Sequence, residues 1–598
     1  MPQNTPKSIL KKIFGYDSFR GAQEEIINHI ISGQNAFVLM PTGGGKSLCY
    51  QVPALCLKGV AIVVSPLIAL MQDQVLALQD LGINAHSINS GVEASEVYRI
   101  KDLLKNNKID LLYVAPERLL MPEFLSLLCD AEIALFAIDE AHCVSQWGHD
   151  FRPIYVQLGI LAEVFKDVPR LALTATADES TKKDIIEKLH LKDARVFLSS
   201  FDRPNIHYTI CEAKNSKKQL LDFINENHKN DSGIVYCNSR KKVEDVTEFL
   251  RAQGLNAYSY HAGMNQKLRS QNLEKFSRSE KIIIVATVAF GMGIDKPDVR
   301  FVAHINLPKN IEGYYQETGR AGRDGLPSDA WMSYSAGDIA ILRSFIDEGN
   351  AAENQKRIEH QKLNSLIGLC ETAGCRRQVL LNYFGEEAGV CGNCDNCLTP
   401  QEMYDGTIGA QKAISACFRT GQRFGVAYLI DVLLGVEGDR IVNFGHNNLS
   451  VFGIGKEYSK QEWQSIFRQL VAMNFLFVNI ANHGGLSITK EGMAFLKNKG
   501  SVNFRKISVK SKKEKTVKAK TSTINLTEID EDLLAKLKAK RMQLAKESNM
   551  PPYVIFHDKA LLGMIAARPK NLDEMSKIEG VGEVKLKKYG EIFLRILR

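Results

Sequence analysis

The sequence has no long hydrophobic run. Its longest apolar stretch, Val60–Met71, is interrupted by Ser65 and Pro66 and falls well short of the roughly 18 residues that a membrane-spanning helix needs. The N-terminal segment MPQNTPKSILKK has no apolar core of the kind that marks a secretion signal. These absences predict a protein that is not secreted and has no membrane partner.

Cysteine is also sparse for the length of the chain. Twelve cysteines among 598 residues do not suggest a disulfide scaffold, so a reducing cytoplasm is the expected location. Charge is nearly balanced outside one segment, because Arg505–Lys520 holds eight basic residues and one glutamate, +7 of the formal net charge of +8. We predict a solvated linker here, and such a linker can also hold phosphate backbones loosely.

What the first 340 or so residues do contain is a regular alternation of short apolar runs with amphipathic stretches. The runs are rich in valine and isoleucine and form two sets, which begin at AFVLM (36–40) and IVYC (234–237). This pattern predicts parallel sheets with helices on both faces. We therefore expect an α/β fold with two tandem doubly wound lobes that join near Ser200–Arg203, and ligand-binding residues just after the strands.

The rest of the chain mixes helices, a cysteine cluster and a predicted hairpin, FVNIANHGGLSIT (477–489), with its turn at His483-Gly484-Gly485. The predicted domains are two lobes at 1–203 and 204–343, a helical cysteine-containing module at 344–405, a domain with the hairpin at 406–504, the basic linker at 505–524 and a small all-α domain at 525–598.

The segment LMPTGGGKS (39–47) follows a predicted strand and opens a predicted helix. Glycines here let backbone N–H groups close around phosphate oxygens, while Lys46 reaches the β- and γ-phosphates and Ser47 binds Mg²⁺. Met40 stands where the strict motif has glycine, and the alternative is a flexible glycine loop. The predicted nucleotide-binding residues are Thr42, Gly43, Gly44, Gly45, Lys46 and Ser47.

Two further motifs fit the same chemistry. In IDEAH (138–142), Asp139 can hold Mg²⁺ and Glu140 can deprotonate the attacking water. In QETGRAGRDG (316–325), Arg320 and Arg323 can stabilise the charge that develops on the γ-phosphate. These arginines belong to the second lobe, so hydrolysis would require closed lobes. The alternatives are a structural acid pair and ordinary surface arginines.

A cluster of four cysteines suits a tetrahedral metal ion. Cys375, Cys391, Cys394 and Cys397 have the spacing C-x₁₅-C-x₂-C-x₂-C, and four thiolates are typical of structural Zn²⁺. An iron–sulfur cluster is the rival, because it also uses C-x₂-C-x₂-C. The ferredoxin pattern would place a further cysteine at Gln401, which leaves Cys375 as the fourth ligand.

Together these motifs resemble the RecQ family of DNA helicases nearly end to end. The resemblance implies two RecA-like lobes, a zinc-binding module, a winged-helix domain and an HRDC domain, with ATP, Mg²⁺ and Zn²⁺ as cofactors. Further segments in the family's order are VSPLIALMQDQ (64–74), YVAPERL (113–119), LTATA (173–177), VYCNSR (235–240), YHAGM (260–264) and TVAFGMGIDKPDVR (287–300).

The segment GYDSFRGAQ (15–23) is similar to the family's adenine-reading motif. The resemblance implies that Tyr16 and Arg20 sandwich the base and that Gln23 reads its edge. The family often has Pro-Gly where this chain has Gly21-Ala22, so the turn is expected to differ while the contacts remain.

The segment AHCVSQWGHDFRP (141–153) resembles the family's aromatic-rich loop. Trp147 and Phe151 can stack on bases of any sequence, and Arg152 can pair with phosphate. The loop begins where the Mg²⁺-binding strand ends, so we interpret it as the coupler between DNA contact and ATP hydrolysis. The alternative is a packed loop that only supports the site.

Three residues nearer the C-terminus are weaker candidates for DNA contact. His483 at the hairpin turn is a candidate wedge at the fork, although a turn histidine is more often only solvated. Tyr553 is a candidate stacking residue, with a half-buried core tyrosine as the alternative. Lys585, in KIEGVGEVKLKKYG (577–590), can grip backbone phosphates.

The resemblance implies an ATP-dependent 3′-to-5′ DNA helicase of the bacterial cytoplasm and nucleoid, acting in recombination, repair and replication. The expected partners are single-stranded DNA, forked or overhang duplex and a single-strand-binding protein. An RNA-unwinding enzyme or translocase with the same motor is a second hypothesis. A non-catalytic clamp that binds ATP as a switch is a third.

Overall fold

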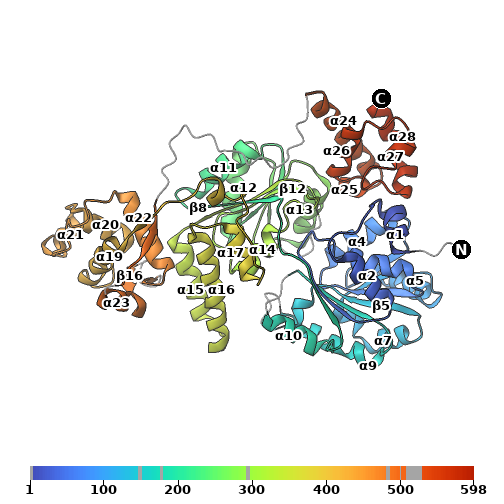
Figure 1. Ribbon diagram of the computed structural model, residues 1–598, viewed down its shortest axis with the longest axis horizontal. Coiled ribbons are helices and arrows are strands. Elements are labelled where there is room, and N and C mark those ends of the chain that lie inside the picture. The colour runs from blue at the N-terminus through green and yellow to red at the C-terminus, as the bar shows by residue number, and fades with distance from the viewer. Residues whose placement is uncertain are drawn as a thin grey trace.

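Two parallel β-sheets organise the N-terminal half of the protein, which confirms the predicted pair of doubly wound lobes (Figure 1). The computed structural model describes residues 5–145, 151–175, 179–290, 296–479, 485–498, 500–506 and 528–598. The strand order is β3-β4-β2-β5-β6-β1-β7 in lobe 1 and β10-β11-β9-β12-β13-β8 in lobe 2. All strand pairs recorded in these two sheets are parallel.

Lobe 1 explains why its strands have continuous apolar sequences. Strands β1, β2, β4 and β6 are buried at every position, because helices cover both faces of the sheet. The strands are β1 (Ala36–Leu39), β2 (Val60–Val64), β3 (Ala85–Ile88), β4 (Leu111–Val114), β5 (Ile133–Ile138), β6 (Arg170–Thr174) and β7 (Arg195–Leu198). The main helices are α1 (Pro6–Ile9), η1 (Leu10–Phe14), α2 (Gln23–Ile31), α3 (Leu48–Cys56), α4 (Ile68–Asp80), α5 (Ala94–Lys105), α7 (Pro122–Cys129), η2 (Ala141–Val144), α8 (Pro153–Val156) and α10 (Glu179–Lys188).

Lobe 2 begins after a short connection, residues 199–205, at the predicted join. Its strands are β8 (Ile206–Glu212), β9 (Ser232–Tyr236), β10 (Ala257–Tyr260), β11 (Ile283–Ala286), β12 (Val299–His304) and β13 (Ser328–Tyr334). Its helices are α11 (Ser216–Asn227), α12 (Arg240–Ala252), α13 (Gln266–Arg278) and α14 (Ile311–Thr318). In lobe 1 the predicted phosphate loop and acid pair follow the carboxyl ends of β1 and β5. In lobe 2, Arg320 and Arg323 lie between α14 and β13, where the Gly322 N–H donates to the Val299 carbonyl at the amino end of β12.

Helices follow lobe 2, and the predicted hairpin is present beyond them. Strand β15 (Leu476–Asn479) pairs antiparallel with β16 (Gly485–Ile488), while the turn with His483 lies outside the described residues. The other elements are α15 (Ala336–Glu348), α16 (Glu353–Glu371), α17 (Arg376–Tyr383), α18 (Asp395–Leu398), β14 (Met403–Asp405), α19 (Thr407–Arg419), α20 (Val426–Leu434), α21 (Asp439–Asn443), α22 (Lys460–Ala472), α23 (Lys490–Lys497) and β17 (Asn503–Arg505).

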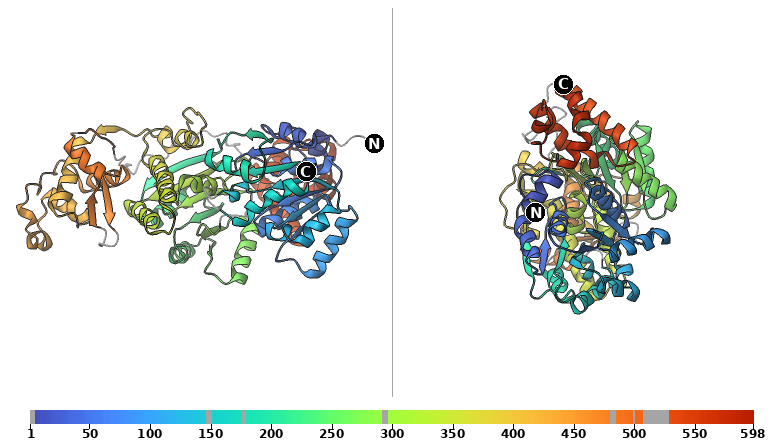
Figure 2. Two further views of the ribbon diagram at one scale, coloured as in Figure 1. Left: turned by 90° about the horizontal axis from the view of Figure 1, so that it is seen from below. Right: turned by 90° about the vertical axis from the view of Figure 1, so that its right-hand side faces the viewer.

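The C-terminal domain is a small bundle with its own apolar core. Its helices are α24 (Glu528–Glu547), α25 (Pro552–Ile555), α26 (Asp558–Ala567), α27 (Leu572–Met575) and α28 (Glu583–Leu597). The bundle packs beside lobe 1, whereas the hairpin domain lies at the opposite end of the molecule (Figure 2). Most of the predicted basic linker lies outside the described residues. None of the helices in the described ranges has the length and apolar character needed to cross a bilayer.

Candidate active site

The predicted phosphate loop connects the carboxyl end of β1 to α3. Gly43 and Gly45 have φ angles of +76° and +83°, a left-handed backbone that glycine adopts without strain. Met40 has no positive φ, so the position that departs from the strict motif does not need glycine. Lys46 Nζ donates hydrogen bonds to the carbonyl oxygens of Met40 (3.0 Å) and Pro41 (3.3 Å). The loop thus has the shape that receives an anion, with its lysine folded over it.

The two predicted acids stand at the end of β5. The Asp139 N–H donates to the Val64 carbonyl at 2.9 Å, and the Tyr155 hydroxyl donates to the Asp139 carbonyl at 3.2 Å. Glu140 has a φ of +49°, which is uncommon for a residue with a side chain and turns the chain sharply into η2. Burial lowers the pKa of Lys46, and these two carboxylates oppose that shift. The acids and the phosphate loop therefore share one electrostatic environment.

His142 links the acid pair to the end of β6, a role that no motif in the sequence predicts. Its Nδ1 lies 2.9 Å from Thr174 Oγ1 and 3.3 Å from Glu140 Oε2. Burial, and then the nearby Lys46 and Arg152, lowers the pKa of His142 to about 3, so its imidazole is neutral at physiological pH. A buried histidine two residues after Glu140, with a threonine at the end of β6, was the signal that could have revealed this contact.

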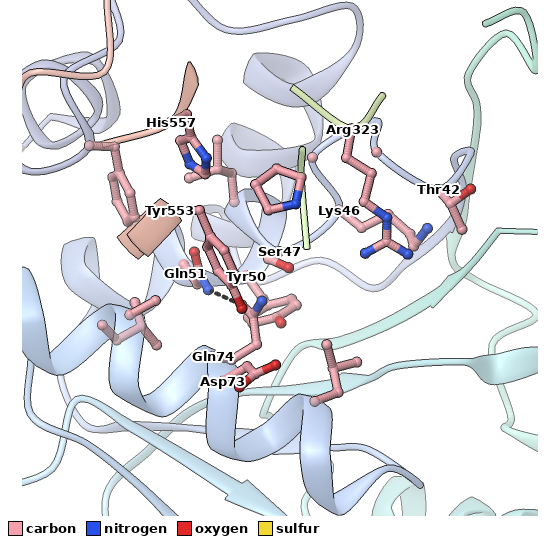
Figure 3. Close-up of a pocket in the computed structure, with 18 of the residues that line it drawn as sticks. Thr42, Lys46, Ser47, Tyr50, Gln51, Asp73, Gln74, Arg323, Tyr553 and His557 are labelled. Carbon is pink, nitrogen blue, oxygen red and sulfur yellow. Dashed lines mark hydrogen bonds between the residues drawn. The ribbon is translucent and has the colours of Figure 1, made fainter. Parts of the chain in front are cut away.

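Lobe 2 contributes two arginines to the same cavity. Arg320 and Arg323 follow α14 and, together with Lys46, Asp139 and Glu140, line a cavity of about 360 Å³. In Figure 3 the Arg323 guanidinium lies beside Lys46 and Thr42 of the phosphate loop. The five residues predicted to be catalytic, which lie in three segments far apart in the sequence, thus meet at one place between the lobes.

The segment predicted to read the base lies at the other end of this cavity. Arg20 Cζ is 5.9 Å from the centroid of the Tyr16 ring, close to the geometry of a base sandwich. The Gln23 amide is turned inward, because its Nε2 donates to the Gly44 (3.3 Å) and Gly45 (3.0 Å) carbonyls. Reading a base edge would therefore require the Gln23 side chain to leave the phosphate loop.

The C-terminal domain covers part of this cavity. Tyr553, His557 and Lys585 are among its lining residues (Figure 3). Lys585 Nζ donates to the Val554 carbonyl at 2.6 Å, and burial lowers the pKa of Lys585 to about 8. The structure thus places Tyr553 and Lys585, predicted to bind DNA, at the nucleotide cavity, and their DNA contacts stay predictions.

Both lobes hold the C-terminal domain in this position. On lobe 1, Lys588 Nζ lies 2.9 Å from Asp80 Oδ1, and the Tyr589 hydroxyl donates to the same oxygen at 3.2 Å. On lobe 2, Arg541 Nη2 donates to Glu280 at 2.7 Å. No pattern in the sequence predicts this docking.

Asp80→Ala should loosen the C-terminal domain, because it removes the carboxylate that pairs with Lys588. The Lys588 ammonium is half exposed, so the pair contributes up to about 1 kcal/mol to the docking of the C-terminal domain. Its loss corresponds to a docking equilibrium constant about five-fold smaller. We expect a fluorescent ADP analogue to dissociate about five-fold faster in stopped flow. Asp102→Ala, which changes an exposed acid on α5, is the matched control and should leave the rate unchanged. An unchanged or slower release from Asp80→Ala would contradict docking as a cover.

The predicted coupling loop is described only in part. Trp147 lies outside the described residues, whereas Phe151 is half-buried. Arg152 Nη1 donates to the Pro66 carbonyl at 3.3 Å, and the Arg152 N–H donates to the Cys143 carbonyl at 2.9 Å. Arg152 thus ties the loop to the segment after β2, within a short stretch of chain from Glu140.

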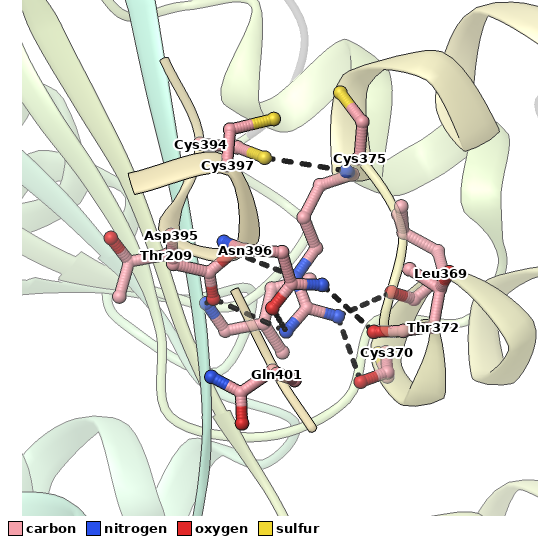
Figure 4. A network of polar contacts seen from close by, with 12 residues as sticks. Thr209, Leu369, Cys370, Thr372, Cys375, Cys394, Asp395, Asn396, Cys397 and Gln401 are labelled. Carbon is pink, nitrogen blue, oxygen red and sulfur yellow. Dashed lines mark hydrogen bonds and ion pairs between the residues drawn. The ribbon is translucent and has the colours of Figure 1, made fainter. Parts of the chain in front are cut away.

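The four predicted metal ligands meet in one cluster, because the Sγ atoms of Cys375, Cys391, Cys394 and Cys397 all lie within 4.8 Å of one another. Figure 4 shows three of them, Cys375, Cys394 and Cys397. The Cys391–Cys397 Sγ separation of 3.9 Å matches the edge of about 3.8 Å expected for tetrahedral Zn²⁺ with Zn–S bonds of about 2.3 Å. Sulfurs this close leave room for a single ion, which favours zinc over an iron–sulfur cluster.

Backbone and side-chain contacts fix the cluster to lobe 2. Cys375 Sγ accepts hydrogen bonds from the N–H groups of Gln378 (3.4 Å) and Cys391 (3.3 Å), which stabilise a thiolate. Asp395, inside the C-x₂-C run, accepts from the Ile210 N–H of β8 at 3.0 Å and pairs with Arg376 Nε at 2.9 Å (Figure 4). A bound ion would therefore hold the helices after lobe 2 against its edge strand.

Elemental analysis should find about one zinc per chain. Cys397→Ser should lose most of this metal and lower the melting temperature, because three thiolates bind Zn²⁺ less tightly than four. Cys129→Ser, at an exposed cysteine outside the cluster, is the matched control and should retain the full zinc content. Iron with visible absorbance, or full zinc content in Cys397→Ser, would contradict the assignment.

Comparisons with known proteins agree with this organisation. Family models match five consecutive parts of the chain. They are described as DEAD/DEAH box helicase (residues 20–185), helicase conserved C-terminal domain (215–325), RecQ zinc-binding (336–398), RQC domain (400–513) and HRDC domain (530–597).

Curated relatives match along almost the whole length. The ATP-dependent DNA helicase RecQ of Haemophilus influenzae is 45% identical over 598 residues, which covers 99% of this chain and 96% of the relative. The chain belongs to the RecQ family. The Pasteurella multocida RecQ is 43% identical, with coverage of 100% of this chain and 94% of the relative. The Bacillus subtilis RecQ is 39% identical, with coverage of 98% of both. Membership of the RecQ family and the predicted order of its modules are thereby confirmed, while the predicted domain limits stay predictions.

Proposed function

We propose that this RecQ-family protein is an ATP-dependent DNA helicase in which ATP binds between lobe 1 and lobe 2. The observation that carries this proposal is one cavity lined by Lys46 and Glu140 from lobe 1 and by Arg320 and Arg323 from lobe 2. Phosphoryl transfer to water needs a positioned base and cations at the γ-phosphate. Because the cations and the base come from different lobes, hydrolysis depends on how the lobes are arranged.

Each site residue then has a defined task. Backbone N–H groups of Thr42–Ser47 hold the phosphates, Lys46 binds the β- and γ-phosphates, and Glu140 accepts the proton of the attacking water. Ser47 and Asp139 line the same cavity with hydroxyl and carboxylate oxygens, the ligand types that Mg²⁺ takes. When bound there, Mg²⁺ supplies positive charge to the phosphates.

The DNA strand is proposed to cross both lobes, and the enzyme to move along it from 3′ to 5′, with the aromatic-rich loop sensing the strand. Three of the relatives are named as DNA helicases, and the zinc and RQC modules distinguish the chain from a minimal motor. We propose forked and overhang duplexes as substrates, a single-strand-binding protein as a partner, and a role in recombination and repair in the cytoplasm at the nucleoid.

ATPase assays with single-stranded DNA and RNA of equal length test the proposal. We expect strong stimulation by DNA alone, followed by unwinding of overhangs, forks or four-way junctions. Equal stimulation by RNA would favour the RNA-unwinding alternative. ATP binding without turnover would favour the clamp. Hydrolysis that is indifferent to DNA would overturn the proposal.

A further inference from the structure

Arg203 lies in the connection between the two lobes and is almost fully buried, with 8% of its surface exposed. Its four hydrogen-bond partners are all backbone carbonyls. On lobe 1, Nη1 donates to the Thr42 carbonyl of the phosphate loop at 2.6 Å. On lobe 2, Nη1 donates to Gly319 at 3.1 Å, and Nη2 donates to Ala321 and Gly322 at 2.9 Å each. A single guanidinium thus joins the two halves of the nucleotide cavity.

The lobe 2 carbonyls belong to Gly319, Ala321 and Gly322. These residues are the sequence neighbours of Arg320 and Arg323, the two arginines assigned to the γ-phosphate. The backbone that carries both cations is therefore fixed by the same side chain that holds the phosphate loop.

The local structure is built around this contact. An added Cβ at Gly43 would lie 3.1 Å from Arg203 Nη1, so only glycine leaves the guanidinium its full space. A Cβ at Gly319 would collide with Thr42 Oγ1, which shows that the two loops also touch directly. Burial lowers the pKa of Arg203, and yet the cation is held by carbonyl dipoles rather than by a carboxylate ion pair. Burying a charge is costly, and the four hydrogen bonds to carbonyls offset that cost only while both loops keep this arrangement.

We propose that Arg203 is a positioning residue for ATP hydrolysis, which rests on the proposed ATPase function. Arg203 is not among the residues that line the nucleotide cavity. It aligns the loop of Arg320 and Arg323 with the phosphate loop, and it transmits a displacement of either loop to the connection on which the lobes turn. Arginine is needed because its planar fork reaches four carbonyls on two sides, whereas a lysine ammonium has three donors on one atom.

Arg377 provides a matched control. It is also a buried arginine beside this connection, with Nη2 donating to Pro204 O at 3.4 Å and to Ile206 O, at the start of β8, at 2.5 Å. Its Nε lies 3.4 Å from Asp202 Oδ1 of the connection. It comes from α17, and its recorded hydrogen-bond partners include no residue of the phosphate loop or of 319–322. Its loss should therefore affect folding stability without a specific effect on hydrolysis.

The experiment compares Arg203→Gln, Arg203→Lys and Arg377→Gln in the full-length enzyme with saturating single-stranded DNA. We expect kcat to fall about 100-fold for Arg203→Gln and about 10-fold for Arg203→Lys, with KM for ATP within about three-fold, because misplaced groups lose rate rather than ground-state binding. Affinity for ADP with aluminium fluoride should fall by a similar factor, about 100-fold for Arg203→Gln, while affinity for ADP alone is retained. Arg377→Gln should keep kcat within about three-fold.

Normal kcat in Arg203→Gln would overturn the inference, as would equal losses of affinity for ADP and for the aluminium fluoride complex. A loss of kcat in Arg377→Gln as large as in Arg203→Gln would also overturn it, because the effect would then be one of folding. Thermal melting of each variant measures that effect directly. Wild-type enzyme without DNA-stimulated hydrolysis in the same assay would instead refute the proposed function.

Discussion

Glu140→Gln should lower the DNA-stimulated kcat for ATP about 10³-fold, because removal of a general base typically costs 10²–10⁴-fold. The amide keeps the size of the side chain but cannot accept the proton of the attacking water. ATP should still bind, since Lys46 and the phosphate loop are unchanged. Release of phosphate measures kcat, and titration with a fluorescent, slowly hydrolysed ATP analogue measures the affinity for ATP.

Glu132→Gln is the matched control for this variant. Glu132 is exposed and immediately precedes β5, so the same chemical change is made at the opposite end of the strand. It should leave kcat within about two-fold, as surface changes usually do. Substantial turnover by Glu140→Gln would show that another group accepts the proton.

Arg152→Ala should reduce DNA-stimulated hydrolysis about 20-fold while the rate without DNA changes less than three-fold. Stacking of a base on an aromatic side chain is typically worth about 1–3 kcal/mol, and the expected loss lies within the same range. The physical reason is that Arg152 joins the aromatic-rich loop to the Pro66 carbonyl, close to the strand end that carries Glu140. Trp147→Ala should have the same selective effect. The measurement is ATP hydrolysis over a range of oligonucleotide concentrations.

Arg99→Ala, at an exposed arginine on α5 that pairs with Glu96, should change neither rate. The decisive quantity is the ratio of the two rates in the Arg152 and Trp147 variants. If both rates fell together, the loop would only support the fold of the site, which is the alternative that the sequence left open.

The chemistry of the site was predictable where residue type and local pattern carry it. Lys46, the acid pair and the cysteines stand in short motifs, and the carboxyl ends of parallel strands meet at one edge of a sheet. The meeting of Arg320 and Arg323 with the phosphate loop was foreseen as a requirement for closed lobes. The cavity lining places these groups together, although their roles stay predictions.

What the sequence did not reveal depends on backbone atoms or on distant packing. The partners of Arg203 are four carbonyl oxygens, which every residue has and which leave no pattern in a sequence. The docking of the C-terminal domain depends on a close backbone approach, in which the Gly580 N–H donates to the Gly15 carbonyl at 2.9 Å. The sequence alone therefore predicts only DNA contacts for Tyr553 and Lys585.

The two anchor points of the C-terminal domain have a mechanical consequence. Asp80 in lobe 1 and Glu280 in lobe 2 grip the same small body through Lys588 and Arg541. While both contacts are made, the C-terminal domain bridges the two lobes and limits how far they can separate. Wider opening of the lobes must break one of the two contacts or move the C-terminal domain together with one lobe. Because the domain stays covalently attached to the chain, its high effective concentration favours the re-formation of a broken contact.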